Sequence, residues 1–317
     1  MKTVIRTDGL LAVEPADVAC LTDAGLSYRE ETCLTEDALI SACRDAAGLL
    51  VLREPITARV LDELPACKVI TRFGVGVDTV DVPAASARGV RVTNVPDANS
   101  SEVASHALAM IMSLVRRLPQ FTAAIRGGTW SYLETGRGMR RVDQLVLGVV
   151  GFGRTGRRVA TAASAIGFQV RAYDPLVPAE TIRAGGAVPV GLEEIITDSD
   201  IVSLHLPLSA ETRDLIDRDA IARMREGAIL VNVSRGGLVD EAALAEALTA
   251  GHLSGAALDA FESEPIQRDS PLLAIPSVLL SPHAGHYSSD SYRETIRKAF
   301  LDVARVLRGQ EPVYPVN

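Results

Sequence analysis

Leu145-Val146-Leu147-Gly148-Val149-Val150-Gly151-Phe152-Gly153-Arg154-Thr155-Gly156 is the stretch of sequence that decides the fold. Its first six residues are apolar or glycine, which predicts a buried strand, and a helical pattern runs from Thr155 to about Ile166. The three glycines between strand and helix have the spacing G-x-G-x-x-G. In this strand–turn–helix context the spacing predicts a turn that binds the pyrophosphate of a dinucleotide.

Each glycine of this turn has its own physical task. Gly151 allows the tight turn, Gly153 lets the backbone approach the pyrophosphate, and Gly156 lets helix and strand pack closely. The helix then points its free N–H groups and the positive end of its dipole at the phosphates. Arg154 and Thr155 lie in the turn and are expected to add contacts to the cofactor.

Asp174 ends the next expected strand, 18 residues beyond Gly156. A carboxylate at this position binds the ribose hydroxyls and repels a 2′-phosphate, so the sequence favours NAD over NADP. Arg171 could instead accommodate such a phosphate. It lies three residues away along a strand, however, and therefore points to the opposite face from Asp174.

The same alternation of apolar runs and helical patterns extends in both directions from the glycine turn. It predicts an α/β fold of two doubly wound parallel-sheet domains, with helices on both faces of each sheet. The expected strands are 1–8, 48–52, 69–70, 90–92, 145–150, 170–173, 201–206, 228–233, 256–258 and 278–280. The expected helices include 35–43, 100–118, 155–166, 241–250 and 289–307.

The segment between the two alternating regions has a different character. A long helix is expected from Ser100 to Leu118, and Pro119 is expected to end it. The stretch 127–141 that follows is irregular and carries Trp130 and Tyr132. Trp130 is either an exposed anchor of a protein interface or an aromatic that fills a gap in its own domain.

Composition excludes several classes of protein. The chain has 317 residues, 47% of them hydrophobic, and its net charge of −8 argues against nucleic acid or an anionic membrane as a partner. No apolar run is long enough for a signal peptide or a membrane span. The four cysteines contain no C-x-x-C pair, so we expect free thiols in a reducing cytoplasm, with neither a metal site nor a disulfide framework.

Three segments near the end of the chain carry the expected chemistry. They are Asn232–Asp240 (NVSRGGLVD), Gly255–Pro265 (GAALDAFESEP) and Ser281–Gly285 (SPHAG). In this order they resemble the D-isomer-specific 2-hydroxyacid dehydrogenases, and Arg72–Asp78 (RFGVGVD) and His205–Leu208 extend the resemblance over nearly the whole chain. The implied activity is NAD-dependent interconversion of a small 2-keto acid and its D-2-hydroxy acid.

The resemblance implies three catalytic residues whose chemistry suits this reaction. Arg235 holds the substrate carboxylate with its forked guanidinium. His283 donates a proton when a keto acid is reduced and accepts one in the reverse direction, and its ordinary pKa near 6.5 suits that exchange. Glu264 is expected to bind the other ring nitrogen, orient the imidazole and favour its protonated form.

The other expected site residues divide between cofactor and substrate. The resemblance places Asp259 against the nicotinamide amide, and Gly74-Val75-Gly76 presents backbone N–H groups to the substrate carboxylate. His106 and His205 are expected to be structural, with His205 near the cofactor. Together the turn and the resemblance give the cofactor set Gly151, Gly153, Arg154, Thr155, Gly156, Asp174, Leu206, Val233, Ser234, Asp259 and Gly285, and the substrate set Arg72, Gly74, Val75, Gly76 and His286.

The resemblance also implies the division of the chain and its assembly. Residues 1–98 with 288–317 would form a flavodoxin-like substrate domain, and residues 99–287 would form a Rossmann NAD domain. The substrate would bind in the cleft between them. Residues 100–141 build a dimer interface in this family, so a homodimer is expected.

Within the family, the motifs resemble the branches of the C-terminal-binding proteins and of phosphoglycerate dehydrogenase. His286 stands where the first branch often carries a tryptophan, and a histidine there could bind a second anionic group of the substrate. A phosphorylated or phosphonate 2-hydroxy acid is therefore one alternative substrate. An NADH-sensing, corepressor-like binding protein is an alternative function, because it would share the fold and the same three residues.

Overall fold

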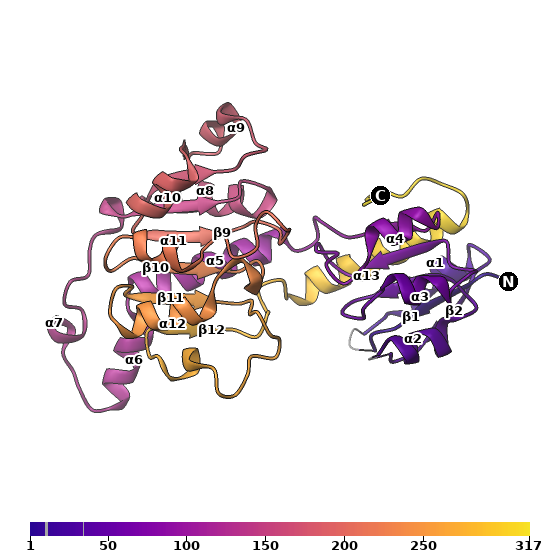
Figure 1. Ribbon diagram of the computed structural model, residues 1–317, viewed down its shortest axis with the longest axis horizontal. Helices are drawn as coiled ribbons and strands as arrows, with labels where there is room; N and C mark the ends of the chain where they lie inside the picture. Colours follow the sequence, from indigo (N-terminus) through magenta and orange to yellow (C-terminus); the bar gives the residue numbers. More distant parts are fainter. Residues whose placement is uncertain (10–11, 34) are drawn as a thin grey trace. The chain divides into compact units, whose positions relative to one another are not determined.

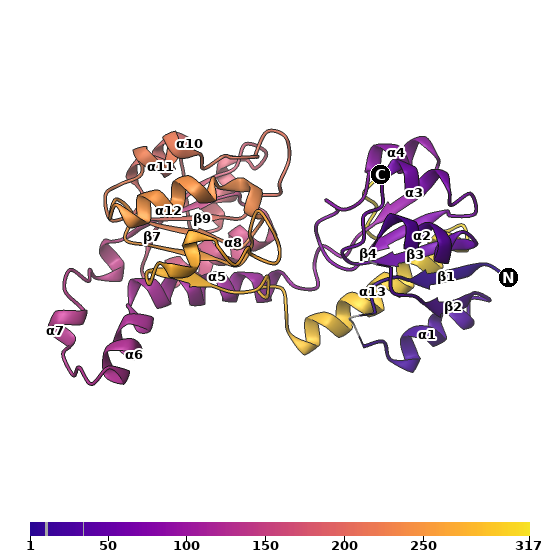
Figure 2. The same cartoon turned by 60° about the horizontal axis from the view of Figure 1, so that its bottom comes forward.

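The computed structural model of the chain describes residues 1–9, 12–33 and 35–317, and these form two compact units. Unit 1 comprises Met1–Asn99 and Tyr287–Asn317, and unit 2 comprises Ser100–His286 (Figures 1 and 2). The chain therefore leaves unit 1 once and returns to it once. Each unit is built around its own parallel sheet.

Unit 1 is a three-layer α/β unit. All neighbouring strands of its sheet are parallel, in the order β2-β1-β3-β4-β5, which is the order of flavodoxin-like folds. Helices α1 and α13 pack on one face, and α2, α3 and α4 pack on the other. The strands are β1 (Thr3–Arg6), β2 (Ser27–Glu30), β3 (Ala46–Val51), β4 (Val69–Arg72) and β5 (Arg91–Thr93), and the helices are α1 (Pro15–Thr22), α2 (Glu36–Cys43), α3 (Ala58–Asp62), α4 (Val82–Ala87) and α13 (Ser289–Leu307).

Alternating side chains along the strands build the two cores of unit 1. Val4 contributes to the core under α1 and α13, whereas the next residue, Ile5, contributes to the core under α2, α3 and α4. This two-sided burial explains why the strands of unit 1 read as apolar runs. All four cysteines lie in this unit as free thiols.

Unit 2 contains the larger sheet, which is also entirely parallel. Its strand order is β12-β11-β10-β9-β6-β7-β8. Helices α5, α8 and α9 contribute to the core on one face, and α10, α11 and α12 contribute to the core on the other. The strands are β6 (Val146–Val150), β7 (Gln169–Tyr173), β8 (Val188–Pro189), β9 (Ile201–Leu204), β10 (Ile229–Asn232), β11 (Gly255–Leu258) and β12 (Val278–Leu280), and these helices are α5 (Ser100–Val115), α8 (Arg154–Ile166), α9 (Ala179–Ala184), α10 (Leu192–Asp198), α11 (Arg218–Arg223) and α12 (Glu241–Thr249).

The strand order of unit 2 predicts where a ligand would bind. The order reverses between β6 and β9, and ligands of open α/β sheets bind at such a switch point, beyond the carboxyl ends of the strands. The glycine turn follows β6, Arg235 follows β10 and Asp259 follows β11. The fold therefore brings the glycine turn, Arg235 and Asp259 to one edge of one sheet.

Two short helices form an arm that projects from the sheet of unit 2. They are α6 (Leu118–Arg126) and α7 (Tyr132–Thr135), and both views show them extending away from the strands (Figures 1 and 2). The expectation that one helix continues to Leu118 and ends at Pro119 is wrong. The break lies at Arg117, whose φ of 51° is left-handed, and Pro119 lies in the first turn of α6, where proline fits.

Candidate active site

The glycine turn has the shape that a dinucleotide phosphate needs. A Cβ on Gly156 would lie 2.0 Å from the carbonyl oxygen of Gly151, so only glycine allows this contact between turn and helix. A Cβ on Gly153, the N-cap residue of α8, would meet no described atom within 4 Å. No side chain or backbone therefore fills the space beside Gly153, and the start of α8 fits a pyrophosphate there.

Asp174 lies at the end of β7 and faces the glycine turn. Its Oδ2 accepts a hydrogen bond from the N–H of Phe152 at 2.7 Å, and its Oδ1 accepts one from the N–H of Leu176 at 2.9 Å. The carboxylate is thus held beside the turn with lone pairs left for further donors. Arg171 forms ion pairs with Glu194 and Asp198 instead.

His205 follows β9 and packs next to the glycine turn. Its Nε2 lies 2.9 Å from Ser203 Oγ, and its Nδ1 is shielded from solvent with no hydrogen-bond partner among the described residues. Burial lowers the pKa of His205 from its ordinary value of 6.5 to about 4. The ring is therefore neutral at neutral pH, which suits a structural group and not a proton donor.

The pKa of His205 predicts how stability depends on pH. Because the pKa is lower in the folded state, the unfolded chain binds a proton more readily between pH 6.5 and 4, and stability falls as the pH falls through this window. As the pH falls, we expect the free energy of unfolding of the wild type to decrease by roughly 1 kcal/mol more per pH unit than that of His205→Gln. Urea unfolding of both proteins at pH 7 and pH 5 measures the difference, and equal losses would contradict it.

Arg235 lies in a tight turn directly after β10. The side chain of Asn232 holds this turn, since its Nδ2 donates to the carbonyl oxygen of Arg235 at 2.7 Å and its Oδ1 accepts from the N–H of Ser234 at 3.0 Å. A Cβ on the next residue, Gly236, would lie 1.8 Å from the backbone carbon of Phe261. This close approach brings Arg235 beside the segment that carries Glu264.

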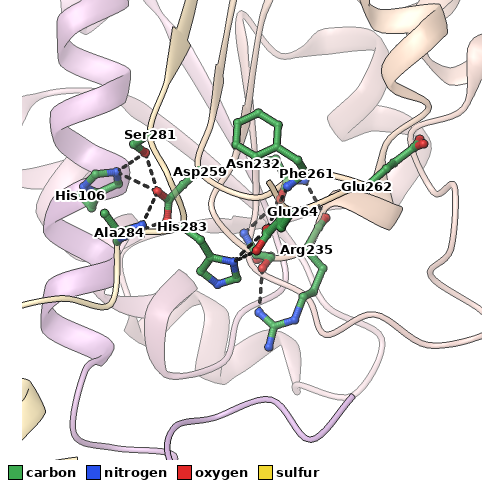
Figure 3. Close-up of polar contacts among 12 residues, drawn as sticks. His106, Asn232, Arg235, Asp259, Phe261, Glu262, Glu264, Ser281, His283 and Ala284 are labelled. Atoms are coloured by element: carbon green, nitrogen blue, oxygen red, sulfur yellow. Dashed lines mark hydrogen bonds and ion pairs between the residues drawn. The ribbon is translucent and has the colours of Figure 1, made fainter. Parts of the chain in front are cut away.

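Glu264 and His283 form a direct pair, as Figure 3 shows. The Nδ1 of His283 lies 2.8 Å from Oε2 and 2.9 Å from Oε1 of Glu264. The backbone N–H of Phe261 also donates to Oε1, at 3.2 Å. Because Nδ1 points at the carboxylate, Nε2 is the ring nitrogen left for a substrate.

The surroundings of Glu264 keep it ionised. Burial raises the pKa of its carboxyl, but the hydrogen bond and charge of His283, the N–H of Phe261 and the charge of Arg235 outweigh burial and hold the pKa below its ordinary value. An ionised Glu264 accepts a proton-bearing Nδ1, which fixes the orientation of the ring. The charge of Arg235 is therefore close enough to act on this pair.

Asp259 is buried at the end of β11, and both of its carboxylate oxygens contact the loop that carries His283. Oδ1 accepts from the N–H of Ala284, and Oδ2 accepts from the N–H of Gly285, each at 2.8 Å. Ser281 adds its hydroxyl to Oδ1 (Figure 3). The sequence did not single out Ser281 or Asn232, although both lie inside the quoted motifs.

The remaining expected residues of unit 2 lie along the same edge. Val233 is buried and Leu206 packs against the core, while Ser234 donates its hydroxyl to the carbonyl oxygen of Leu204 at 2.8 Å. The rings of His286 and His283 stand edge to face, with their centroids 5.8 Å apart. His252 lies away from this edge, before β11, with Nε2 3.0 Å from the carbonyl oxygen of Ile221.

The expected substrate residues of unit 1 lie at the end of β4. Gly74 has a φ of 124°, and a Cβ there would lie 2.1 Å from Arg72 Nη1. The carbonyl oxygens of Gly74 and Val75 accept hydrogen bonds from the N–H of Val95 and the side chain of Asn94. The loop is thus fixed within its own unit.

Residues 1–9, 12–33 and 35–317 contain no group of three or more His, Cys, Asp or Glu side chains that could hold a metal ion. Among the helices formed by these residues, none has the length and apolar character required to span a membrane.

Comparison with known proteins agrees with the motifs. Residues 108–285 match the family model for the NAD-binding domain of D-isomer-specific 2-hydroxyacid dehydrogenases. D-3-phosphoglycerate dehydrogenase of Mycobacterium bovis is 40% identical over 295 residues, which are 93% of this chain and 54% of that protein. Glyoxylate reductase of Korarchaeum cryptofilum is 35% identical over 293 residues, 92% of this chain and 88% of that protein.

A solved structure agrees over the whole length. D-lactate dehydrogenase from Aquifex aeolicus, complexed with NAD and lactic acid, aligns with a TM-score of 0.84 at 30% identity and covers 97% of this chain and 96% of its own. The chain spans about half the length of the phosphoglycerate dehydrogenases it matches. The expected fold class and the expected cofactor, NAD, are confirmed. The chain belongs to the D-isomer-specific 2-hydroxyacid dehydrogenase family.

Proposed function

We propose that the protein is an NAD-dependent oxidoreductase that interconverts a small 2-keto acid and its D-2-hydroxy acid. The observation that carries this proposal is the pair of His283 and Glu264, held 2.8 Å apart at the carboxyl edge of the sheet with Arg235 beside it.

The free cysteines fit a reducing compartment, so we place the protein in the cytoplasm.

The residues of the site divide the chemistry among them. When bound, NADH supplies the hydride that reduces the C2 carbonyl. Arg235 binds the substrate carboxylate and polarises the adjacent carbonyl. With Nδ1 of His283 committed to Glu264, Nε2 donates a proton to the carbonyl oxygen, and in the reverse direction it removes the proton from the hydroxyl.

Gly153 and the N-terminus of α8 would hold the pyrophosphate, and Asp174 would bind the ribose of the adenosine half. These assignments rest on the open space at Gly153 and on the position of the Asp174 carboxylate beside the turn. The backbone N–H groups at the start of α8 suit the negative pyrophosphate, and the Asp174 carboxylate suits the ribose hydroxyls.

A panel of keto acids tests the proposal. The full chain is incubated with NADH and, in turn, glyoxylate, pyruvate, hydroxypyruvate and 3-phosphohydroxypyruvate, and NADH absorbance is followed. At least one acid is expected to oxidise NADH far above the rate without substrate. If NADH binds and no acid of the panel or of a wider set is reduced, the proposed activity is wrong.

A phosphorylated substrate is the second candidate. It is supported by the 40% identity to proteins named D-3-phosphoglycerate dehydrogenase and by His286, whose ring lies 5.8 Å from that of His283. A protonated histidine at this position would bind a second anionic group. A preference for 3-phosphohydroxypyruvate over hydroxypyruvate would favour this candidate, and the opposite order would exclude it.

The charge of Asp174 predicts the choice between NADH and NADPH. Asp174→Asn keeps the size of the side chain but removes the charge that would repel a 2′-phosphate, a repulsion of at least about 1 kcal/mol. We expect kcat/KM for NADPH, relative to NADH, to rise roughly fivefold or more. Asp143→Asn, which changes an exposed carboxylate that pairs with Arg141, is the matched control. An unchanged cofactor ratio in Asp174→Asn would contradict the assignment.

We further propose that the arm of α6 and α7 forms a homodimer interface. Neither helix has a buried residue. The arm nevertheless carries large apolar side chains: Trp130 is 88% exposed and Leu133 is 73% exposed. Large apolar side chains at this exposure are typical of an interface with another subunit. The other exposed apolar side chains of the arm are Leu118, Ile125 and Tyr132.

Sedimentation or light scattering tests the dimer. The wild type is expected at twice the chain mass of 33.6 kDa, and the double variant Trp130→Ser, Leu133→Ser is expected to shift toward the monomer. Leu176→Ser is the control, because Leu176 is 90% exposed outside the arm. A monomeric wild type, or a double variant that stays fully dimeric, would refute this interface.

A further inference from the structure

A hydrogen-bond network lies behind the loop that carries His283. Its centre is Asp259, which is 2% exposed and accepts from Ser281 Oγ at 2.5 Å and from the N–H groups of Ala284 and Gly285 at 2.8 Å. These three donors lie on both sides of His283 in the chain. The carboxylate therefore holds the two ends of the loop together (Figure 3).

His106 reaches this network from another element, helix α5. Its Nε2 lies 2.9 Å from Ser281 Oγ and 3.5 Å from Asp259 Oδ1. The Ser281 hydroxyl has one proton, and an ionised Asp259 can only accept, so this proton goes to Asp259. Ser281 must then accept from His106, which means that Nε2 of His106 carries a proton and acts as a donor.

The loop needs such support because its backbone is strained at the reactive residue. His283 has a φ of 53°, a left-handed conformation that residues with a Cβ rarely adopt. Two residues later, a Cβ on Gly285 would lie 2.8 Å from Asp259 Oδ2 and 3.3 Å from His106 Cδ2. The loop therefore packs directly against both Asp259 and the ring of His106.

We propose that His106 is a positioning residue for the proton donor. Its Nε2–H fixes Ser281 and, through Ser281, Asp259, and this chain of bonds holds the loop in the conformation that keeps His283 Nδ1 on Glu264. The proposal deepens the proposed function and rests on it for the role of His283. The placement of His283 by the network can nevertheless be measured without turnover.

Two variants of His106 separate its hydrogen bond from its bulk. In glutamine the side-chain nitrogen is as many bonds from Cα as Nε2 is in histidine, so His106→Gln keeps the donor. His106→Phe keeps a ring of similar shape and removes the donor. Ser281→Ala removes the hydroxyl that links His106 to Asp259. It replaces His106→Phe as the test variant if His106→Phe fails to fold.

NMR of the full chain labelled with ¹⁵N-histidine gives the decisive readout. The chain has only five histidines, so single substitutions assign every ring signal. The Nδ1–H signal of His283, protected by Glu264, is expected in the wild type and in His106→Gln. It is expected to broaden or vanish in His106→Phe and Ser281→Ala, while thermal unfolding and NADH binding stay near wild type.

Kinetics with NADH and glyoxylate as the probe provides the second readout. We expect His106→Phe to lower kcat about 10- to 100-fold with little change in the KM of NADH, and His106→Gln to restore most of it. The proposal is overturned if His106→Phe keeps the His283 signal, or if His106→Gln loses that signal while folded. A protein that reduces no keto acid would refute the proposed function, and the NMR result would still decide the role of His106.

Discussion

Replacing His283 with alanine is expected to lower kcat for keto-acid reduction by about 10²–10⁴-fold and to leave NADH affinity unchanged. The reason is that the imidazole is the proton donor in the proposed reaction, and Glu264 holds it by Nδ1 at 2.8 Å with Nε2 left for the substrate. Without the ring, a water molecule would have to supply the proton, and water is a far weaker acid than an imidazolium and is not oriented by Glu264.

The controls for this variant separate chemistry from folding and binding. NADH fluorescence measures cofactor affinity, and thermal unfolding measures stability. His252→Ala removes a histidine that contacts the carbonyl oxygen of Ile221 in α11, and this variant should keep its turnover. If His283→Ala reduces the keto acid at the wild-type rate, His283 is not the proton donor.

Replacing Arg235 with alanine is expected to lower kcat/KM by about 10²–10³-fold. Its guanidinium would hold the substrate carboxylate and stabilise the charge that develops on the carbonyl oxygen. Arg235→Lys should recover only part of the loss, because an ammonium group supplies the charge without the two parallel N–H donors of the fork. The KM of the keto acid should rise while the KM of NADH stays constant.

Loss of charge alone could lower activity, so a second arginine is needed for comparison. Arg218 is an exposed residue of α11 that pairs with Glu246, and Arg218→Ala should leave kcat/KM unchanged. Steady-state kinetics on Arg235→Ala, Arg235→Lys and Arg218→Ala separates loss of the substrate contact from loss of a positive charge. If Arg235→Lys equals the wild type, a forked contact to the carboxylate is excluded.

The sequence predicted the strands that are buried on both faces. The runs Val146–Val150 and Gly255–Leu258 were expected within a residue of where they lie, because inner parallel strands, buried on both faces, read as continuous apolar runs. Strand β2, Ser27–Glu30 with the sequence SYRE, was not expected. It is an edge strand without a buried residue, so its pairing with β1 comes from tertiary contact and not from a local pattern.

The helix break at Arg117 shows a second limit of structure prediction from the sequence. A proline after an apolar helix predicts an end, but the same residue also fits the first turn of a new helix. Arg117 adopts a left-handed φ of 51° without being glycine or asparagine, and nothing in its side chain indicates this. Its side chain donates a hydrogen bond to the carbonyl oxygen of Thr135 in α7 at 3.1 Å, a contact that cannot be read from neighbouring residues.

The site was predictable where it depends on residue type and spacing. The partnership of Glu264 with His283 was expected and lies at hydrogen-bond distance. The contact of Asp259 with a nicotinamide amide stays a prediction. The hydrogen bonds that its two oxygens accept from the His283 loop were not expected, because they join residues 25 and 26 positions apart in the chain. His106 lies 175 residues before its partner Ser281, and no local pattern could have joined them.

The central claim is that this chain transfers a hydride between a nicotinamide and C2 of a keto acid and that the product has the D configuration. One measurement tests it most directly. NADH that carries deuterium at both C4 positions is incubated with the full chain and the best acid of the panel apart from glyoxylate, whose product has no D or L form, and the product is analysed by chiral chromatography and mass spectrometry. We predict one deuterium at C2 and only the D-2-hydroxy acid. A product with no deuterium at C2, or with the L configuration, would contradict it.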